Sequence, residues 1–370
     1  MSEQTALDVD LIIAVHSDAR PIERAVRSAL AASTASLRVT VVCHNVETEP
    51  IERRLGDLCA DPRVRLVQHR DAVKSPAGPF NAGLELATAR YTSIMGSDDS
   101  LEAGAIDSWL RRADETRADV VIAGLAHAVG GAVPTPPVRL FREHNLDMVR
   151  DRLSYRTAPL GLVSRETFGH LRLTEGLRTG EDIAYGLELW AHARRIEFAR
   201  SGPGYLVHAD ADERVTTALG PIEDDLEFVE GLLSSATLRG LGAKQRQAFL
   251  TKMVRGSLLP LVTNRLNSWH WSPQQNEALM IVAEQFLAAA GARAGASPAE
   301  AFPSLSRAEA RLFDAMLARD SNAETLVAAA RATRRRLRPA SLLTPRLGHV
   351  LRADAPLRFT AASVALFTKG

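Results

Sequence analysis

Two adjacent aspartates are the first residues in the chain whose pattern could support chemistry. Residues 91–95 have the character of a buried strand, and Asp98 and Asp99 follow it closely. In an open α/β sheet, carboxylates at the carboxyl end of a strand commonly bind a cation and phosphate groups. No lysine or arginine lies within five residues of either aspartate, so a divalent metal is a candidate for the neutralising charge. The alternative is a turn in which Asp98, Asp99 or Ser100 caps the next helix.

A second acidic pair, Glu181 and Asp182, precedes a segment whose apolar residues recur at helical spacing. The helix dipole and free backbone N–H groups favour carboxylates in the first turn of a helix, so the pair can be purely structural. A catalytic role is the other interpretation. The residues alone leave both open.

Alternating strands and helices must position these carboxylates. Apolar runs predict strands, amphipathic runs predict helices, and the connections between them are short. We therefore expect a largely parallel sheet with helices on both faces. The predicted strands are 9–15, 37–43, 64–68, 91–95 and 120–125, and the predicted helices are 22–30, 51–59, 81–89 and 103–117.

The segment after the first strand argues against two common nucleotide-binding classes. Residues 14–21 contain no glycine, whereas a dinucleotide-binding fold needs a glycine-rich turn there for close approach of the pyrophosphate. The P-loop pattern of many ATPases and kinases is also absent from the sequence. An oxidoreductase and a simple kinase are thus disfavoured.

The composition is that of a soluble globular protein, with 370 residues of which 46% are apolar and 24% charged. The 45 basic and 44 acidic residues give a net charge of +1, which offers no reason to propose nucleic acid as a partner. Two cysteines are too few for a disulfide scaffold or a zinc site. Because no signal-peptide or membrane-spanning pattern is found, we expect a cytoplasmic protein.

The chain changes character near Val215, where strand-like runs give way to helical periodicity. We expect an α/β domain at residues 1–217 and a helical region at residues 218–370. The predicted helices of this region are 226–233, 247–261, 273–290, 307–318 and 323–337.

The end of the helical region is rich in arginine. Five arginines lie within residues 331–338, and Arg346, Arg352 and Arg358 follow among leucines. Asp354 is the only acidic residue after position 330. Such a segment suits contact with an anionic membrane surface or a polyanionic acceptor. Arginines that are simply solvated, or that pair with another subunit of a homo-oligomer, are the alternative.

Five short segments, taken in the order in which they occur along the chain, resemble the inverting, GT-A-fold glycosyltransferases of family two. The resemblance covers roughly residues 9–217. It implies an α/β fold with a Rossmann-like, mainly parallel sheet, a nucleoside-diphosphate sugar as donor and a hydroxyl group as acceptor. The segments that carry it are Leu11–Ser17, Val39–Val42, Asn81–Leu84, Met95–Asp99 and Gly180–Asp182.

The resemblance also implies roles for the two acidic pairs. Asp98 and Asp99 align with aspartates that hold Mg²⁺ or Mn²⁺ against the diphosphate, although Gly96 stands where the family has its first aspartate. Asp182 aligns with the general base, which is needed because an alcohol is a poor nucleophile. Glu181 is a candidate for orienting the acceptor.

Other positions align with the family's donor site. His44 and Asn45 follow the second strand where the family commonly has two aspartates, and Phe80 replaces a common arginine. Asn45 can still donate and accept hydrogen bonds. The residues expected to contact the donor are His16, Ser17, Asn45, Lys74, Asn81, Ser97, Asp98, His208 and Arg214.

The sequence thus predicts a cytoplasmic inverting glycosyltransferase, with peripheral contact at the inner face of the cell membrane as a further expectation. Bacterial surface glycan or polymer synthesis is implied, with a glycan, polyol-phosphate or lipid-linked acceptor. Two alternatives stay open. A catalytically silent nucleotide-sugar-binding module would explain the departures at Gly96, Cys43, His44 and Phe80. A nucleotidyltransferase would need a glycine-rich basic loop, which residues 16–21 lack.

Overall fold

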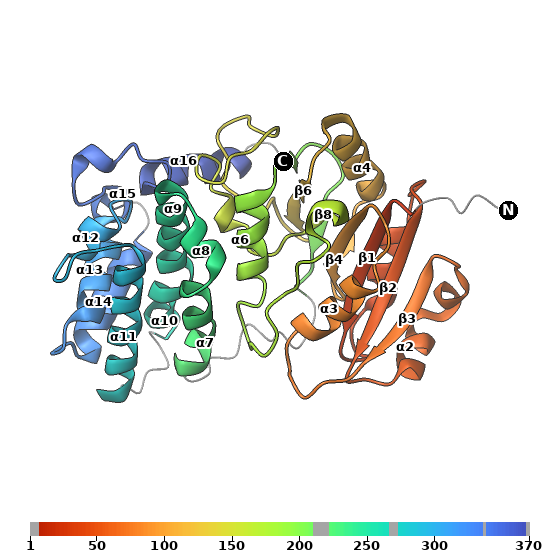
Figure 1. The fold of residues 1–370 in the computed structure, drawn as a ribbon, viewed down its shortest axis with the longest axis horizontal. Helices are drawn as coiled ribbons and strands as arrows, with labels where there is room; N and C mark the ends of the chain where they lie inside the picture. The colour runs from red at the N-terminus through yellow and green to blue at the C-terminus, as the bar shows by residue number, and fades with distance from the viewer. Residues whose placement is uncertain (1–6, 210–221, 266–272, 336–337, 368–370) are drawn as a thin grey trace.

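A seven-stranded sheet forms the centre of the N-terminal half of the chain (Figure 1). The computed structural model describes residues 7–209, 222–265, 273–335 and 338–367. Within these residues the strand order of the large sheet is β3-β2-β1-β4-β8-β6-β9. The strands are β1 Val9–Val15, β2 Leu37–His44, β3 Val64–His69, β4 Tyr91–Gly96, β6 Val120–Ala123, β8 Gly161–Ser164 and β9 Ile196–Ala199.

The parallel strands β1, β2, β3 and β4 bring their carboxyl ends to one edge of the sheet. β1 pairs with β2 in a register that sets Val15 opposite Cys43, and with β4 in a register that sets Ala14 opposite Gly96. β3 extends the sheet beyond β2, also in parallel. The loops that follow these four strands therefore meet, as expected for the ligand-binding edge of an open α/β sheet.

The mainly parallel sheet is confirmed, with one exception. β8 runs antiparallel to both of its neighbours, β4 and β6. The predicted strand 120–125 is also divided, because β6 ends at Ala123 and residues 125–127 form β7 of a second sheet. In that three-stranded sheet, β10 Tyr205–Val207 lies between β5 Ser100–Leu101 and β7 Leu125–His127.

Helices cover both faces of the large sheet. Successive residues of β1 point to opposite sides, so apolar residues on both faces need to be buried. Leu11 and Ile13 belong to a buried cluster shared with helices α1 Ile22–Leu30, α2 Thr48–Leu55 and α4 Ala105–Thr116. Ile12 belongs to a second cluster shared with α3 Ala77–Glu85 and α6 Ile183–His192. All three β1 side chains are at most 1% exposed.

Helix α3 begins four residues earlier than predicted, at Ala77 instead of Asn81. Pro79 lies in its first turn, where the backbone N–H groups have no partner within the helix. A proline is tolerated there, so the Gly/Pro-rich segment that looked like a loop is the start of the helix.

The C-terminal part is helical, as predicted, and packs against α6 (Figure 1). One buried apolar cluster runs from Ile12 of the sheet to Phe313 and Leu366 of this region. The predicted boundary at 217/218 falls outside the described residues and stays a prediction. The helices are α7 Ile222–Leu233, α8 Ala236–Gly240, α9 Ala243–Met253, α10 Leu259–Thr263, α11 Pro273–Ala289, α12 Pro298–Ala301, α13 Arg307–Leu317, α14 Ala323–Arg334, α15 Pro339–Leu342 and α16 Pro356–Phe367.

Two details complete the helical region. A π-helical turn, Val254–Leu258, joins α9 to α10, so the predicted helix 247–261 is continuous in direction but not in hydrogen-bond pattern. Among the described helices, none combines the length and the apolar character that crossing a membrane requires.

Candidate active site

A cavity of about 850 Å³ opens where β1, β2 and β4 end. Segments from the sheet edge form one side, and the segment that leads into α6 forms another. Residues far apart in the chain therefore share one space. The predicted site residues that line it are His16, Asn45, Lys74, Ser97, Asp98, Asp99, Glu181, Asp182 and His208.

Asp98 forms an ion pair with Arg20, whose Nη1 lies 2.8 Å from Asp98 Oδ2. The two side chains are only 14% and 17% exposed, and the Arg24 guanidinium donates to the backbone carbonyl of Asp98. The absence of a basic residue near Asp98 in the sequence was thus a poor guide, because the cation comes from 78 residues away. Arg20 was missed, although it follows β1, the neighbour of the strand that carries Asp98.

Asp99 connects the end of β4 to β10. Its Oδ2 accepts a hydrogen bond from Tyr205 Oη at 2.5 Å, and its Oδ1 accepts one from the backbone N–H of His208 at 3.0 Å. Burial raises the pKa of Asp99, and the hydrogen bonds from Tyr205 and His208 oppose this shift. Both carboxylate oxygens are therefore occupied in holding β10 and His208 in place.

The lack of a side chain at Gly96 leaves space for the carboxylates of Asp98 and Asp99. A Cβ atom at Gly96 would lie 2.9 Å from Asp99 Oδ2 and 3.1 Å from Asp98 Oδ1. The first of these distances is shorter than real Cβ contacts, so one carboxylate would have to move. The departure at position 96 thus leaves room for the present orientation of both aspartates.

Asp182 occupies the N-cap position of α6, but its side chain makes no capping hydrogen bond. Its position still allows the favourable interaction with the helix dipole, and the residue also lines the cavity. Burial raises the pKa of Asp182, and the charge of Lys252 opposes that shift. Burial and the nearby Asp182 raise the pKa of Glu181 to about 7.

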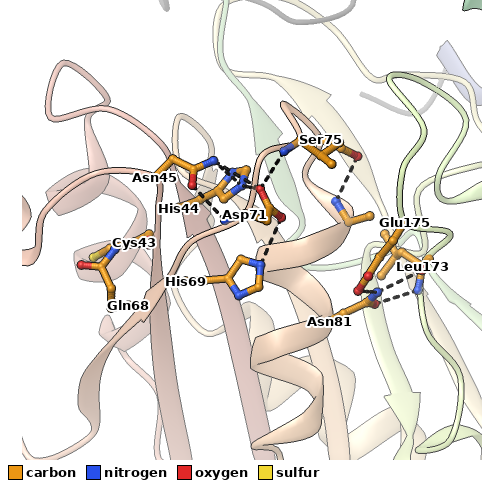
Figure 2. Close-up of polar contacts among 12 residues, drawn as sticks. Cys43, His44, Asn45, Gln68, His69, Asp71, Ser75, Asn81, Leu173 and Glu175 are labelled. Carbon is orange, nitrogen blue, oxygen red and sulfur yellow. Dashed lines mark hydrogen bonds and ion pairs between the residues drawn. The ribbon is translucent and has the colours of Figure 1, made fainter.

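A polar network that the sequence did not indicate lies at the ends of β2 and β3 (Figure 2). Asp71 Oδ1 lies 2.8 Å from His44 Nε2 and 3.3 Å from the Asn45 amide nitrogen, and Asp71 Oδ2 lies 3.2 Å from His69 Nε2. Burial opposes ionisation of Asp71, but the hydrogen bonds from His44 and Asn45 outweigh it and lower its pKa to about 2. A carboxylate from β3 thus stands beside the place where the family has aspartates after β2.

Two predicted donor contacts do not line the cavity. The buried Asn81 amide bonds to the backbone of Leu173 at 2.8 and 3.0 Å and to Glu175 at 2.8 Å (Figure 2). The Ser17 hydroxyl accepts from the backbone N–H of Ala19 at 3.2 Å, in the turn before α1. Asn81 therefore fastens the segment that precedes Glu181, and Ser17 shapes a turn.

The remaining predicted donor residues differ in how they are held. His208 Nε2 lies 2.8 Å from Ser100 Oγ, which orients its ring at the cavity wall. Lys74 is exposed at the rim. Arg214 lies outside the described residues.

Comparisons with known proteins relate the sequence of this chain to a family of enzymes. Residues 10–172 match the model of glycosyl transferase family 2. The succinoglycan biosynthesis protein ExoO of Rhizobium meliloti is 28% identical over 262 residues, which are 65% of this chain and 72% of that protein. A poly(ribitol-phosphate) beta-glucosyltransferase of Bacillus spizizenii is 21% identical over 43% of this chain and only 25% of its own length.

Solved structures agree on the fold. The Staphylococcus aureus TarS fragment 1–349 in complex with UDP-GlcNAc superimposes with a TM-score of 0.70 at 17% identity, covering 89% of this chain and 92% of that one. The same fragment in complex with UDP gives a TM-score of 0.68. The shared fold includes the helical C-terminal region. Residues 10–172 therefore match glycosyl transferase family 2, and the protein is a glycosyltransferase of the GT-A fold.

Proposed function

We propose that this glycosyltransferase moves a sugar from a nucleoside diphosphate to a hydroxyl acceptor by a single displacement with inversion. The observation that carries the proposal is that Asp98 and Asp182 line the same cavity, one at the end of β4 and the other at the start of α6. A leaving diphosphate at the first and an acceptor hydroxyl at the second would lie on opposite sides of the sugar. No covalent glycosyl-enzyme is needed.

Asp182 is the proposed general base. Its carboxylate is not used to cap α6, and burial raises its pKa toward the range in which a base works best. Glu181, with a pKa of about 7, is placed to bind the acceptor beside it. An alcohol attacks an anomeric carbon only as its proton is removed, so the base should govern kcat.

A divalent cation fits this site through Asp98. The described residues contain no group of three or more His, Cys, Asp or Glu side chains that could hold a metal. Mg²⁺, however, commonly binds proteins through one or two carboxylates together with substrate phosphates and water. Hydrogen bonds from β10 occupy both carboxylate oxygens of Asp99, and Arg20 occupies Oδ2 of Asp98. Asp98 Oδ1 is therefore the oxygen that would hold Mg²⁺ or Mn²⁺, whose charge would stabilise the leaving diphosphate.

A uridine diphosphate sugar is the proposed donor, because the TarS fragment of the same fold binds UDP-GlcNAc and UDP. The acceptor is proposed to be a bacterial cell-surface glycan or a polyol-phosphate polymer. ExoO and the poly(ribitol-phosphate) glucosyltransferase are named for such polymers. We propose that the reaction takes place at the cytoplasmic side of the membrane.

Two measurements test the proposal. Calorimetric titration with UDP, GDP, CDP and TDP, each with and without Mn²⁺, should show metal-dependent binding of UDP alone. Hydrolysis of UDP-sugars should then be compared between the wild type and Asp182→Asn. We expect the variant to lose roughly 100- to 10,000-fold in kcat with its UDP affinity unchanged, as is typical when a general base is removed.

The outcomes separate the proposal from its rival. UDP binding without any turnover of UDP-sugars, with or without candidate acceptors, would favour a silent binding module. Full activity of Asp182→Asn would end its assignment as the base.

A further inference from the structure

Lys252 is a buried lysine in the helical region. It lies on α9, its exposed fraction is 6%, and the hydrogen bond that its Nζ makes in the described structure goes to Met253 Sδ at 3.7 Å. A thioether is a weak acceptor. Because burying an ammonium group without a counter-charge costs several kcal/mol, a nearby anion is expected.

The side chain lies against the first turn of α6. Lys252 lines a small cavity of about 10 Å³ together with Ile183 and Gly186, which lie one and four residues after Asp182. Thr157 lines both this cavity and the large one, so the two are separated by a single wall. Figure 1 shows α8 and α9 beside α6. Lys252 therefore lies beside the start of α6, across this wall from the donor cavity.

The charge of Asp182, the residue before Ile183, acts on Lys252 across the start of α6, although the described residues show no ion pair between the two side chains. Other charged groups of the packed elements are oriented elsewhere: the Arg156 guanidinium donates to the backbone carbonyls of Thr135 and Ala123. Glu181 and Arg178 line the donor cavity beside Asp182. Burial lowers the pKa of Lys252 to about 8, and the charge of Asp182 opposes that shift.

We infer that Lys252 is a positioning residue that keeps the Asp182 carboxylate ionised, so that the helical region supplies part of the catalytic base. This inference rests on the proposed role of Asp182. It gives the helical region a direct part in the chemistry, in addition to any acceptor it binds. The two groups titrate as a pair. Without the lysine, its charge no longer opposes the effect of burial, which raises the pKa of Asp182.

The first test is the pH dependence of sugar transfer or UDP-sugar hydrolysis by Lys252→Met, a change that preserves most of the side-chain volume. Without the lysine, the pKa of Asp182 should rise, so the acid limb of the kcat profile should move up by about one pH unit or more. The KM for the donor should not change. Lys244→Met, on the exposed part of the same helix, is the matched control and should leave the profile in place.

A second test does not depend on activity. Urea unfolding of the wild type, Lys252→Met, Asp182→Asn and the double variant forms a double-mutant cycle. We expect non-additive effects, with the double variant less destabilised than the sum of the single changes. If Lys252→Met fails to fold, Lys252→Gln takes its place in both tests.

The two tests distinguish the inference from the proposal on which it rests. An inactive Asp182→Asn, an unshifted profile for Lys252→Met and an additive cycle would overturn the role of Lys252 alone. A fully active Asp182→Asn would overturn the proposed base, and with it the positioning role, even if the cycle showed that the two side chains interact.

Discussion

Several acidic side chains in the cavity are largely buried, where their ionised form is unfavourable. Asp98 is paired with Arg20, and burial raises the pKa of both Asp182 and Glu181. A site of this kind sacrifices stability for chemistry, because buried ionisable groups resist folding in their charged form. Glu181 offers the clearest way to measure that sacrifice.

Glu181→Gln should make the protein more stable above neutral pH. Burial and Asp182 raise the pKa of Glu181 from 4.5 to about 7, so the folded protein binds the extra proton between these values and stability falls as pH rises through them. After allowance for partial exposure, the variant should gain about 2 kcal/mol at pH 8 and nothing at pH 4. Urea unfolding at both pH values measures this.

The control for this prediction is Glu49→Gln, on an exposed position of α2, which should show no such gain. Equal stability of Glu181→Gln and the wild type at pH 8 would show that Glu181 is better solvated than its position indicates.

At the scale of elements, the short strand β10 links the two sheets of the catalytic domain to the site. It pairs with β5 and β7, and its Tyr205 hydroxyl donates to Asp99 at the end of β4. The Tyr205 hydroxyl also accepts from the backbone N–H of Gly96 at 3.1 Å. The position of His208, one residue beyond the strand, therefore depends on this hydroxyl.

Tyr205→Phe should weaken both folding and donor binding. The change leaves one oxygen of the buried Asp99 carboxylate without its donor, which should cost about 1–3 kcal/mol of stability. His208 should lose its fixed position, so the affinity for UDP should fall. Urea unfolding and calorimetric titration report the two effects.

Tyr91→Phe is a matched control, because the Tyr91 hydroxyl is also buried but donates to the Ala118 carbonyl at 3.3 Å, away from the cavity. It should lose less stability and retain UDP affinity. Unchanged stability and UDP binding in Tyr205→Phe would refute the positioning role of β10.

At the scale of the whole molecule, the C-terminal segment carries both apolar and basic groups at its surface. Leu347, Leu351 and Val364 are 61%, 71% and 53% exposed. Some nearby arginines are partly satisfied within the protein: Arg346 pairs with Glu300 at 3.3 Å, and Arg358 donates to the Leu351 carbonyl at 2.8 Å. Apolar side chains set among arginines suit the surface of an anionic bilayer.

The protein should therefore sediment with vesicles that contain phosphatidylglycerol and not with vesicles of phosphatidylcholine alone. The variant Leu347→Gln/Leu351→Gln should lose most of this binding, because it removes the apolar contact and retains the arginines. Exposed Val129→Gln, in the N-terminal half, is a control that should bind as the wild type does. Failure of the wild type to sediment with either vesicle would refute the membrane contact.

Much of the fold follows from local pattern. The run 9–15 is β1 to the residue, because a strand buried on both faces is mostly apolar, and its one buried carboxylate, Asp10, is paired with Arg38. The start of α3 and the division of residues 120–127 were predicted wrongly. The Gly/Pro-rich start of α3 was read as a loop, whereas the strand 120–125 was predicted to continue through Gly124, where the chain passes from one sheet to the other.

The candidate site divides in the same way. Asp98, Asp99, Glu181 and Asp182 were recognisable because each pair sits in a short motif at the end of a predicted element. Arg20 and Lys252, which act on Asp98 and Asp182, and Asp71, which bonds to His44 and Asn45, were not recognisable, because they come from separate segments. Their relation to the motifs exists only once β1 lies beside β4, β3 beside β2, and α9 against α6. Electrostatic interaction depends on distance in space, and only the tertiary structure sets that distance.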